Sequence, residues 1–385
     1  MKTIYLDNNA TTMVAPEVVE AMQPFFGEYY GNPSSIHKFG GSVHKHLDTA
    51  REQVASLCNA SPSEIFFTSC GSESDNQALK GFVRSRKSRA RIITSTVEHP
   101  AVLNTCRALR EDGVAVSEIP VNEYGMPDMD AFYQADIDSD TLVSFMWANN
   151  ETGVMFPIRE ISEYVKSKGG MFHTDAVQAA GKIPLDVQEV PVDILAISGH
   201  KLHAPKGVGI IYIRDGISLE PLITGGHQES GMRAGTENVP YIIGLGKACE
   251  LAKNSLDRDA GHERMLRDKL EKALLKKCPG AKLNGDPGKR LPNTTNISFE
   301  FIEGEAVLLL LDEHGISASS GSACTTGSLE PSHVMRAMGI PYTFAHSSIR
   351  FSLSRYTTEQ EIDTVIEVMP PIVKRLRGLS PFVKE

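Results

Sequence analysis

The segment from Ile194 to Lys201, with the sequence ILAISGHK, is an apolar run that ends in a serine, a glycine, a histidine and a lysine. A short run of this kind, bounded by polar turn residues, has the length of a strand that is buried on both faces. A second apolar run, Val208–Ile213, follows after a turn that contains Pro205 and Gly207. The segment therefore predicts a buried strand that places Lys201 at an edge of a sheet.

Similar apolar runs lie on both sides of this segment and alternate with stretches of helical periodicity. Parallel strands need crossover connections, which helices supply, so the alternation predicts an α/β fold with a largely parallel sheet. In open sheets of this class, ligands bind beside the carboxyl ends of the strands, and the polar turns that follow the strands should converge on one site. The seven expected strands are Glu64–Thr68, Arg91–Ser95, Ala115–Ile119, Leu142–Trp147, Met171–Asp175, Ile194–Ser198 and Val208–Ile213.

The pattern changes after residue 244, where a long charged helix replaces the alternation. Because 385 residues exceed the usual size of one hydrophobic core, we expect two domains. The large domain is predicted to comprise residues 14–255, and the smaller α+β domain residues 1–13 and 256–385. The elements expected beyond residue 244 are helices over Gly244–Leu275 and Thr358–Arg377 and strands over Thr294–Phe301 and Ile349–Ser352.

The composition argues against several classes of protein. Hydrophobic residues make up 41% and charged residues 23%, and no apolar run approaches the roughly 18 to 20 residues of a membrane span. The net charge of -9 gives no reason to bind nucleic acid, and the densest basic cluster, Arg84–Arg91, is short enough to be a solvated helix end. The first residues lack a secretory pattern. We expect a soluble, cytoplasmic protein with no nucleic-acid or membrane partner.

Six cysteines, at positions 58, 70, 106, 249, 278 and 324, form no C-x-x-C pair and no zinc-type grouping with histidines. Disulfides and an intrinsic metal site are therefore not expected. In a reducing compartment most such thiols are small buried hydrophobic groups, so a functional role for any one of them needs a local reason.

Several strand-end residues together favour a pyridine cofactor. Lys201, in a concave site, could form a Schiff base, and Asp175 could pair with a protonated pyridine nitrogen and keep the ring an electron sink. His99 could stack on the ring and exchange protons near neutral pH. The turn Ser69–Glu73, before a helix expected over Ser74–Arg84, offers hydroxyls and backbone N–H groups to a phosphate. Each residue also has a simpler interpretation: a surface lysine, a helix cap or a common helix start.

At the level of whole motifs the chain resembles the cysteine desulfurases of the NifS/IscS type, which are class V aminotransferase-like, fold-type I pyridoxal-phosphate enzymes. The order and spacing of the motifs make the resemblance specific, and they run from the first residues nearly to the last. The matching segments are Tyr5–Thr12, Gly31–His37, Thr96–Pro100, Asn149–Gly153, His173–Gln178, Ser198–Lys201, Arg233–Asn238, Ser319–Cys324 and Ser348–Arg350.

The resemblance implies pyridoxal 5'-phosphate as the cofactor and a role for each matching residue. Lys201 would be bonded to the cofactor and serve as catalytic base, Asp175 would contact the pyridine nitrogen, Gln178 the phenolic oxygen, and His99 would lie over the ring. Asn150 and Arg350 would hold the substrate carboxylate, for which a guanidinium presents a planar fork. The residues implied for the phosphate are Gly71, Ser72, Ser198, His200 and, from a second subunit of a homodimer with shared sites, Thr236.

Two departures from the family pattern are visible. Cys70-Gly71-Ser72 stands where Gly-Ala-Thr is common, which keeps a hydroxyl and affects only fine positioning. Ala204 replaces a usual glycine after Lys201, which a backbone with negative φ tolerates.

Cys324 lies in Ser317–Ser328, a segment rich in small polar residues and poor in anchoring ones, which predicts an exposed loop that can move. An exposed thiol forms the nucleophilic thiolate more easily than a buried one, although such a cysteine could also be incidental. The resemblance implies that Cys324 takes sulfur from L-cysteine as a persulfide, that L-alanine leaves, and that an iron–sulfur scaffold of the NifU/IscU type or another acceptor receives the sulfur. The resemblance also allows Cys324 to contact a nascent iron–sulfur cluster.

Three other functions remain open on the sequence. A selenocysteine lyase or a small-amino-acid aminotransferase would share Lys201 and Asp175, but transamination has no need of Cys324. A non-catalytic binding or scaffold protein on a retained enzyme fold would lack the cofactor and be colourless. A cofactor-free thiol acyltransferase would leave the turns of Lys201 and Asp175 without a purpose.

Overall fold

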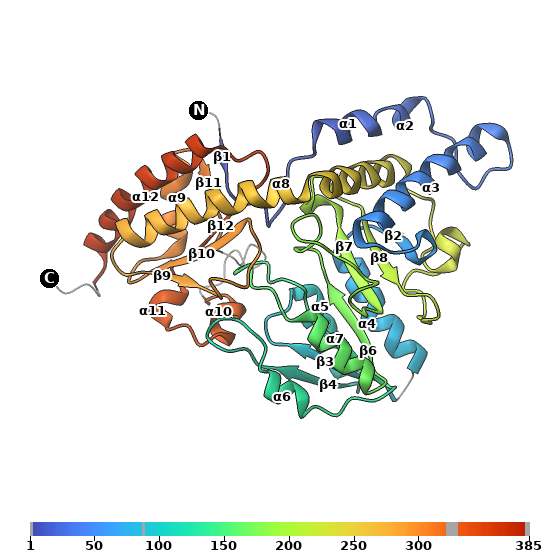
Figure 1. Cartoon of the computed structure of the whole chain (residues 1–385), viewed down its shortest axis with the longest axis horizontal. Coiled ribbons are helices and arrows are strands. Elements are labelled where there is room, and N and C mark those ends of the chain that lie inside the picture. Colours follow the sequence, from blue (N-terminus) through green and yellow to red (C-terminus); the bar gives the residue numbers. More distant parts are fainter. Residues whose placement is uncertain (1–2, 87–88, 321–329, 382–385) are drawn as a thin grey trace.

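The computed structural model describes residues 3–86, 89–320 and 330–381. Figure 1 shows a larger body built around one sheet and a smaller body built around another, with one long helix running along both. No helix among these residues combines the length and the apolar character needed to cross a membrane.

The larger body contains a seven-stranded sheet in the order β2-β8-β7-β6-β5-β3-β4. All neighbours are parallel except β8, which is antiparallel to both β2 and β7. The α/β fold with a mostly parallel sheet is therefore confirmed. The strands are β2 (Ile65–Thr68), β3 (Arg91–Ser95), β4 (Ala115–Ile119), β5 (Thr141–Ser144), β6 (Met171–Asp175), β7 (Ile194–Ser198) and β8 (Gly209–Ile213).

The strand β5 ends earlier than its apolar run predicted, which was Leu142–Trp147. At residue 146 the backbone N–H of Met146 donates to Glu98 Oε1 and not to a neighbouring strand, at 3.0 Å. The ladder with β3 stops at the pair Thr94 and Ser144. A buried side-chain carboxylate thus replaces the strand partner at the edge where the strands end.

The central strands read as continuous apolar runs because helices cover both faces of the sheet. Leu195 and Ile197 point into a core shared with α1 (Pro16–Met22), α3 (Lys38–Cys58) and α7 (Ile158–Ser167), whereas Ile194 points into a second core formed with α4 and α5. The latter two helices are α4 (Gly71–Arg86) and α5 (Pro100–Glu111). Alternate residues of β7 therefore serve opposite cores, as the period of two of a strand requires.

The smaller body has its own core around the antiparallel sheet β12-β10-β9 and the parallel pair β1-β11. Ile4 and Leu6, at the start of the chain, are buried in this core with α9 and α12. The elements are β1 (Ile4–Tyr5), β9 (Ala281–Asn284), β10 (Thr294–Phe299), β11 (Ile316–Ser317), β12 (Ser348–Ser352), α9 (Gly304–Glu313) and α12 (Glu359–Leu379). The exact domain boundaries at residues 13 and 255 stay a prediction.

The remaining short helices are α2 (Pro24–Gly27), α6 (Met129–Tyr133), α10 (His333–Ala337) and α11 (Tyr342–Ala345). The long helix is α8 (Val239–Lys277), which begins five residues before the expected Gly244. Pro240 stands in its first turn, where a missing N–H costs no intrahelical bond, so the proline starts the helix and does not break it.

Two parts of α8 join different cores. Its N-terminal half packs on α3 in the core of the larger body, and Leu266, Leu270 and Leu274 lie in the core of the smaller one. Between these apolar stretches the helix buries polar side chains, Ser255, Asp259 and Glu263.

A pair of glycines in α8 gives a test of this packing. A Cβ on Gly246 would lie 2.6 Å from Ala50 Cα in α3, whereas a Cβ on Gly261 would meet nothing within 4 Å. We expect Gly246→Ala to destabilise the protein by about 1–3 kcal/mol through overpacking, and Gly261→Ala to stabilise it by about 0.5–1 kcal/mol through helix propensity. Thermal denaturation of both variants against the wild type measures the two effects. A Gly246→Ala variant as stable as Gly261→Ala would contradict the close approach of α3 and α8.

Candidate active site

A cavity of about 330 Å³ lies at the carboxyl ends of the central strands. It brings together most of the residues that the sequence nominated, from five strand ends and turns of the larger body and one strand of the smaller body. These are Gly71, Ser72, His99, Asn150, Asp175, Gln178, Ser198, His200, Lys201 and Arg350.

Lys201 is the last residue of a 3-10 turn, Gly199–Lys201, that directly continues β7. Its Nζ donates to the backbone carbonyl oxygens of Asn9 and Ala10, at 2.6 and 2.7 Å. The same N-terminal segment is tied to this turn by Thr12, whose N–H and Oγ1 both donate to the carbonyl of His200. The amine is therefore aimed by backbone acceptors that lie 191 and 192 residues away in the sequence.

Asp175 ends β6 and is buried, and its Oδ1 accepts a hydrogen bond from the N–H of Val177 at 2.9 Å. Burial raises the pKa of this carboxyl group, while the charges of His99 and Lys201 oppose the rise. A cationic partner in the cavity would favour the carboxylate further.

His99 caps α5, and its Nδ1 accepts from the N–H of Ala101 at 3.1 Å. The neutral ring therefore carries its proton on Nε2, which is the only ring nitrogen left for the cavity. Burial lowers the pKa of His99, and the nearby charges of Lys201 and His333 lower it further. His99 therefore caps a helix, which was the simpler interpretation of its position, and also lines the cavity.

Two buried acids near Asp175 were missed by sequence reasoning. Asp75 and Glu98 are almost fully buried. Burial, followed by the charge of Asp175, raises the pKa of Asp75 well above its usual range. Burial also raises the pKa of Glu98 to about 8, against the hydrogen bonds from Ser95 and the Met146 backbone. Asp75 Oδ1 lies 3.6 Å from Nε2 of His173. No local sequence pattern distinguishes these carboxyl groups from surface acids, because their raised pKa values come from burial in the folded chain.

The turn Ser69–Glu73 has the features of an anion cradle. Helix α4 begins at Gly71, so the first N–H groups of a 16-residue helix lack intrahelical acceptors. A Cβ on Gly71 would lie 2.7 Å from Val177 Cγ2, which leaves room only for the glycine that is present. Ser198 Oγ is buried at the cavity wall and has no hydrogen-bond partner within the described part of the chain.

His200 completes this corner of the cavity. Its Nδ1 lies 3.2 Å from Thr11 Oγ1, and burial lowers its pKa to about 4, so the ring is neutral at physiological pH. An unpartnered buried hydroxyl, open helix N–H groups and a neutral imidazole are a donor set that fits a phosphate. A bound phosphate would satisfy Ser198, which the protein alone leaves without a partner.

Gln178 is held at both ends of its side-chain amide. Nε2 donates to the carbonyl of Asn9 at 3.0 Å, and Oε1 accepts from Nζ of Lys182 at 3.0 Å. The sequence did not single out Lys182, although its spacing of four residues from Gln178 could have suggested the contact.

Arg350 is 2% exposed and so lies in the interior of the protein. Its Nη2 donates to Asp7 Oδ1 at 2.6 Å and its Nη1 to the backbone carbonyl of Asn150 at 3.0 Å. The side chain of Asn150 makes neither contact. Asp7 was not identified as a site residue, yet it holds the guanidinium at the mouth of the cavity.

Two nominated residues are not in this group. Thr236 is exposed and lines a different cavity, of about 180 Å³, with Ser69 and Arg233. Cys324 lies outside the described residues. The described residues on either side of it contact the site. Ser319 exchanges backbone hydrogen bonds with Arg350, and Nε2 of His333 donates to the carbonyl of Glu98 at 2.9 Å.

Comparisons with known proteins agree with this geometry. The family described as aminotransferase class-V matches residues 4–365. The chain is 59% identical to "Cysteine desulfurase" of Trichormus azollae over 382 residues, covering 99% of this chain and 96% of that protein. It is 55% identical to "Cysteine desulfurase NifS" of Azotobacter vinelandii over 383 residues, covering 99% of this chain and 95% of that one.

Solved structures show the same likeness. A structure titled "NIFS-LIKE PROTEIN" superposes with a TM-score of 0.91 at 42% identity, covering 97% of this chain and all of that chain. Another, "SspA in complex with cysteine", has a TM-score of 0.81 at 35% identity and covers 92% of this chain. On this evidence the chain belongs to the class-V aminotransferases and, within that family, to the cysteine desulfurases.

Proposed function

We propose that the protein is a pyridoxal-phosphate-dependent cysteine desulfurase, a sulfurtransferase that converts L-cysteine to L-alanine and passes the sulfur to an acceptor through Cys324. The observation that carries the proposal is the convergence of Lys201, Asp175 and the unpartnered hydroxyl of Ser198 in one cavity of a chain so close to known cysteine desulfurases.

The residues that would hold the cofactor divide by chemistry. Lys201 would bond to it covalently, Asp175 would face its pyridine nitrogen, and His99 and Gln178 would contact the ring and the phenolic oxygen. When bound, the cofactor withdraws electrons from the substrate Cα and so weakens the bonds around that carbon. The groups assigned to the phosphate are Gly71, Ser72, Ser198, His200 and Thr236 of a second subunit.

Lys201 is the base in this proposal, and the N-terminal segment aims it. The carbonyl oxygens of Asn9 and Ala10 accept hydrogen bonds from the amine of Lys201, and the lone pair of the neutral amine would take the Cα proton of the substrate. Nε2 of His99 faces the same cavity and can donate a proton there, because Nδ1 is occupied by the backbone of α5.

Arg350 would bind the substrate carboxylate with the help of Asn150. Its guanidinium already lies against the carboxylate of Asp7, so its orientation is set before substrate arrives. Nε has no hydrogen-bond partner in the described ranges, which leaves a donor for a second carboxylate.

Sulfur transfer would take place at Cys324. Its thiolate attacks the substrate sulfur, so that an S–S bond forms as the C–S bond breaks and the electron pair of the C–S bond goes to carbon, which takes up a proton. In balance, L-cysteine and the Cys324 thiol give L-alanine and a Cys324 persulfide. Cys324 is four residues beyond Ser320, so the length of the chain limits it to within about 14 Å of that residue. The carbonyl of Ser320 accepts a hydrogen bond from Oγ of Ser348, in the same strand as Arg350.

The proposal includes partners and a compartment. The acceptor is an iron–sulfur scaffold of the NifU/IscU type, and the protein acts in the cytoplasm as a homodimer whose partner subunit supplies Thr236. Large apolar side chains around α2 and the start of α3 are exposed and would be buried in such a dimer. They are Phe26, Tyr30, Ile36 and Phe39.

The first test addresses the thiol. We expect Cys324→Ser to abolish alanine production from L-cysteine while keeping the visible absorbance of the bound cofactor, because only the nucleophile is lost. Mass spectrometry after incubation with cysteine should place a persulfide on the Cys324 peptide of the wild type. Cys278→Ala, which removes a buried thiol of the smaller body, is the matched control. Full alanine production by Cys324→Ser would favour a lyase-type reaction that does not use this thiol.

The second test addresses the lysine. Borohydride reduction of the holoenzyme should attach the cofactor to the Lys201 peptide, because reduction traps a lysine bonded to the cofactor. Lys201→Arg should give no attachment and no alanine, whereas Lys206→Arg, an exposed lysine of the same turn, should behave as the wild type. Attachment at another lysine would refute the assignment, and a colourless wild type would favour a non-catalytic relative.

A further inference from the structure

Lys182 is a buried lysine that the proposed mechanism does not use. It is 7% exposed, and its Nζ donates to both the backbone carbonyl and the Oε1 of Gln178, at 3.1 and 3.0 Å. A protonated lysine can only donate, so the contact identifies Oε1 as the oxygen of the Gln178 amide. The NH₂ end must then face the opposite side, where it donates to the carbonyl of Asn9.

This contact connects Lys182 to the reactive end of the cavity. The carbonyl of Asn9 accepts from Nε2 of Gln178 at 3.0 Å and also from Nζ of Lys201 at 2.6 Å. If the Gln178 amide turned over, its oxygen would face the Asn9 carbonyl, and the two acceptors would repel each other. The orientation of the Gln178 amide therefore affects the contact proposed for Gln178 with the phenolic oxygen. It also affects the Asn9 carbonyl, which Gln178 shares with Lys201.

Lys182 and Glu263 of α8 are both buried, and each influences the pKa of the other. Burial lowers the pKa of Lys182 to about 7, the charge of Glu263 opposes this, and the charges of Lys201 and Arg350 add to it. Glu263 is 7% exposed, and burial raises its pKa to about 8 against the influence of Lys182 and Arg355, with Asp259 adding to the rise. Burying an ionisable group costs stability, and such groups retained in spite of that cost invite a search for a role.

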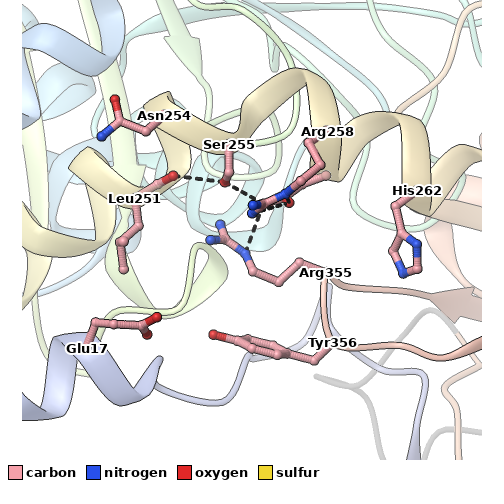
Figure 2. Close-up of a pocket in the computed structure, with 9 residues that line it drawn as sticks. Glu17, Leu251, Asn254, Ser255, Arg258, His262, Arg355 and Tyr356 are labelled. Atoms are coloured by element: carbon pink, nitrogen blue, oxygen red, sulfur yellow. Dashed lines mark hydrogen bonds and ion pairs between the residues drawn. The ribbon is translucent and has the colours of Figure 1, made fainter.

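A second cavity lies beside Asp259, one helical turn from Glu263. Asp259 accepts from Ser255 at 2.5 Å, from Arg258 at 3.0 Å and from Arg355 at 3.1 Å. Figure 2 shows Ser255, Arg258 and Arg355 converging, with His262 to the right and Tyr356 below. The cavity there measures about 530 Å³. Asp259 thus ties α8 to the turn of Arg355.

We propose that Lys182 is a positioning residue that fixes the Gln178 amide for its contact with the cofactor. This inference rests on the proposed function, in which Gln178 faces the phenolic oxygen. It adds to that function a buried donor that sets the direction of the Gln178 amide.

The test compares Lys182→Met with the wild-type holoenzyme. Because Met cannot donate, the Gln178 amide loses its orientation, and the cofactor's visible absorbance band should shift or titrate at a different pH. We expect kcat to fall about 10- to 100-fold, the scale for loss of one charge-assisted hydrogen bond, and KM for cysteine to change less than about threefold, since Arg350 is untouched. A crystal structure of the variant should show the Gln178 amide displaced from the Asn9 carbonyl.

Two further variants separate positioning from stability. Lys182→Met/Glu263→Leu removes both buried charges, so it should regain thermal stability lost by Lys182→Met but not regain kcat or the wild-type absorbance band. Lys166→Met removes the hydrogen-bonded partner of the fully buried Asp193, far from Gln178, so it should lower the melting temperature without moving the band.

The outcomes distinguish this inference from the function on which it rests. A wild-type band and kcat in Lys182→Met, or recovery of kcat in the double variant, would overturn the positioning role and leave the desulfurase proposal standing. If the wild type bound no cofactor, the desulfurase proposal would fail. The crystal structure would then still decide the positioning role, because a Gln178 amide that stayed on the Asn9 carbonyl without Lys182 would refute it.

Discussion

The carbonyl oxygens of Asn9 and Ala10, which accept the hydrogen bonds of Lys201, are the contact on which the arrangement of the site depends. The segment that carries them begins at Leu6, in the core of the smaller body, and reaches Thr12, which is bonded to the turn of Lys201 in the larger body. The same carbonyl of Asn9 orients Gln178. One stretch of backbone therefore orients Lys201, Gln178 and, through its neighbour Asp7, Arg350.

The junction of the two bodies is polar, and this matters for how the site is held. Helix α8 is apolar where it meets each core and buries Asp259 and Glu263 between them. Ion pairs and hydrogen bonds fix direction more strictly than apolar packing does, because they fail when donors and acceptors are displaced by an ångström or less. The contact of Asp259 with Arg355 therefore sets the position of α8 against the turn of Arg355 more narrowly than leucines in the same place would.

Much of the fold and the core of the site could be predicted from the sequence, because each element is local. Most strands of the large sheet contain a short apolar run between polar turns, with Asp175 at the end of β6 and Lys201 in the turn that continues β7. The contacts of Asp7 and Asn9 could not be predicted, since they join residues 343 and 192 apart. The Asn9 contact also uses a backbone carbonyl, which every residue possesses, so no side-chain pattern marks it. The burial that perturbs Glu98 likewise appears only after the chain has folded.

The bonds between the first strand and the last sheet also constrain how the polypeptide acquires its shape during synthesis. Asn8 donates its side-chain amide to the carbonyl of Ser352, 344 residues later. At about 5–20 residues per second, a ribosome needs about 20 to 70 seconds to produce that partner. Through this interval Asn8 has no Ser352 to bind, so the cavity around Lys201 cannot be completed while the strands of the larger body are being synthesised. Its walls come together only after β12 has been made.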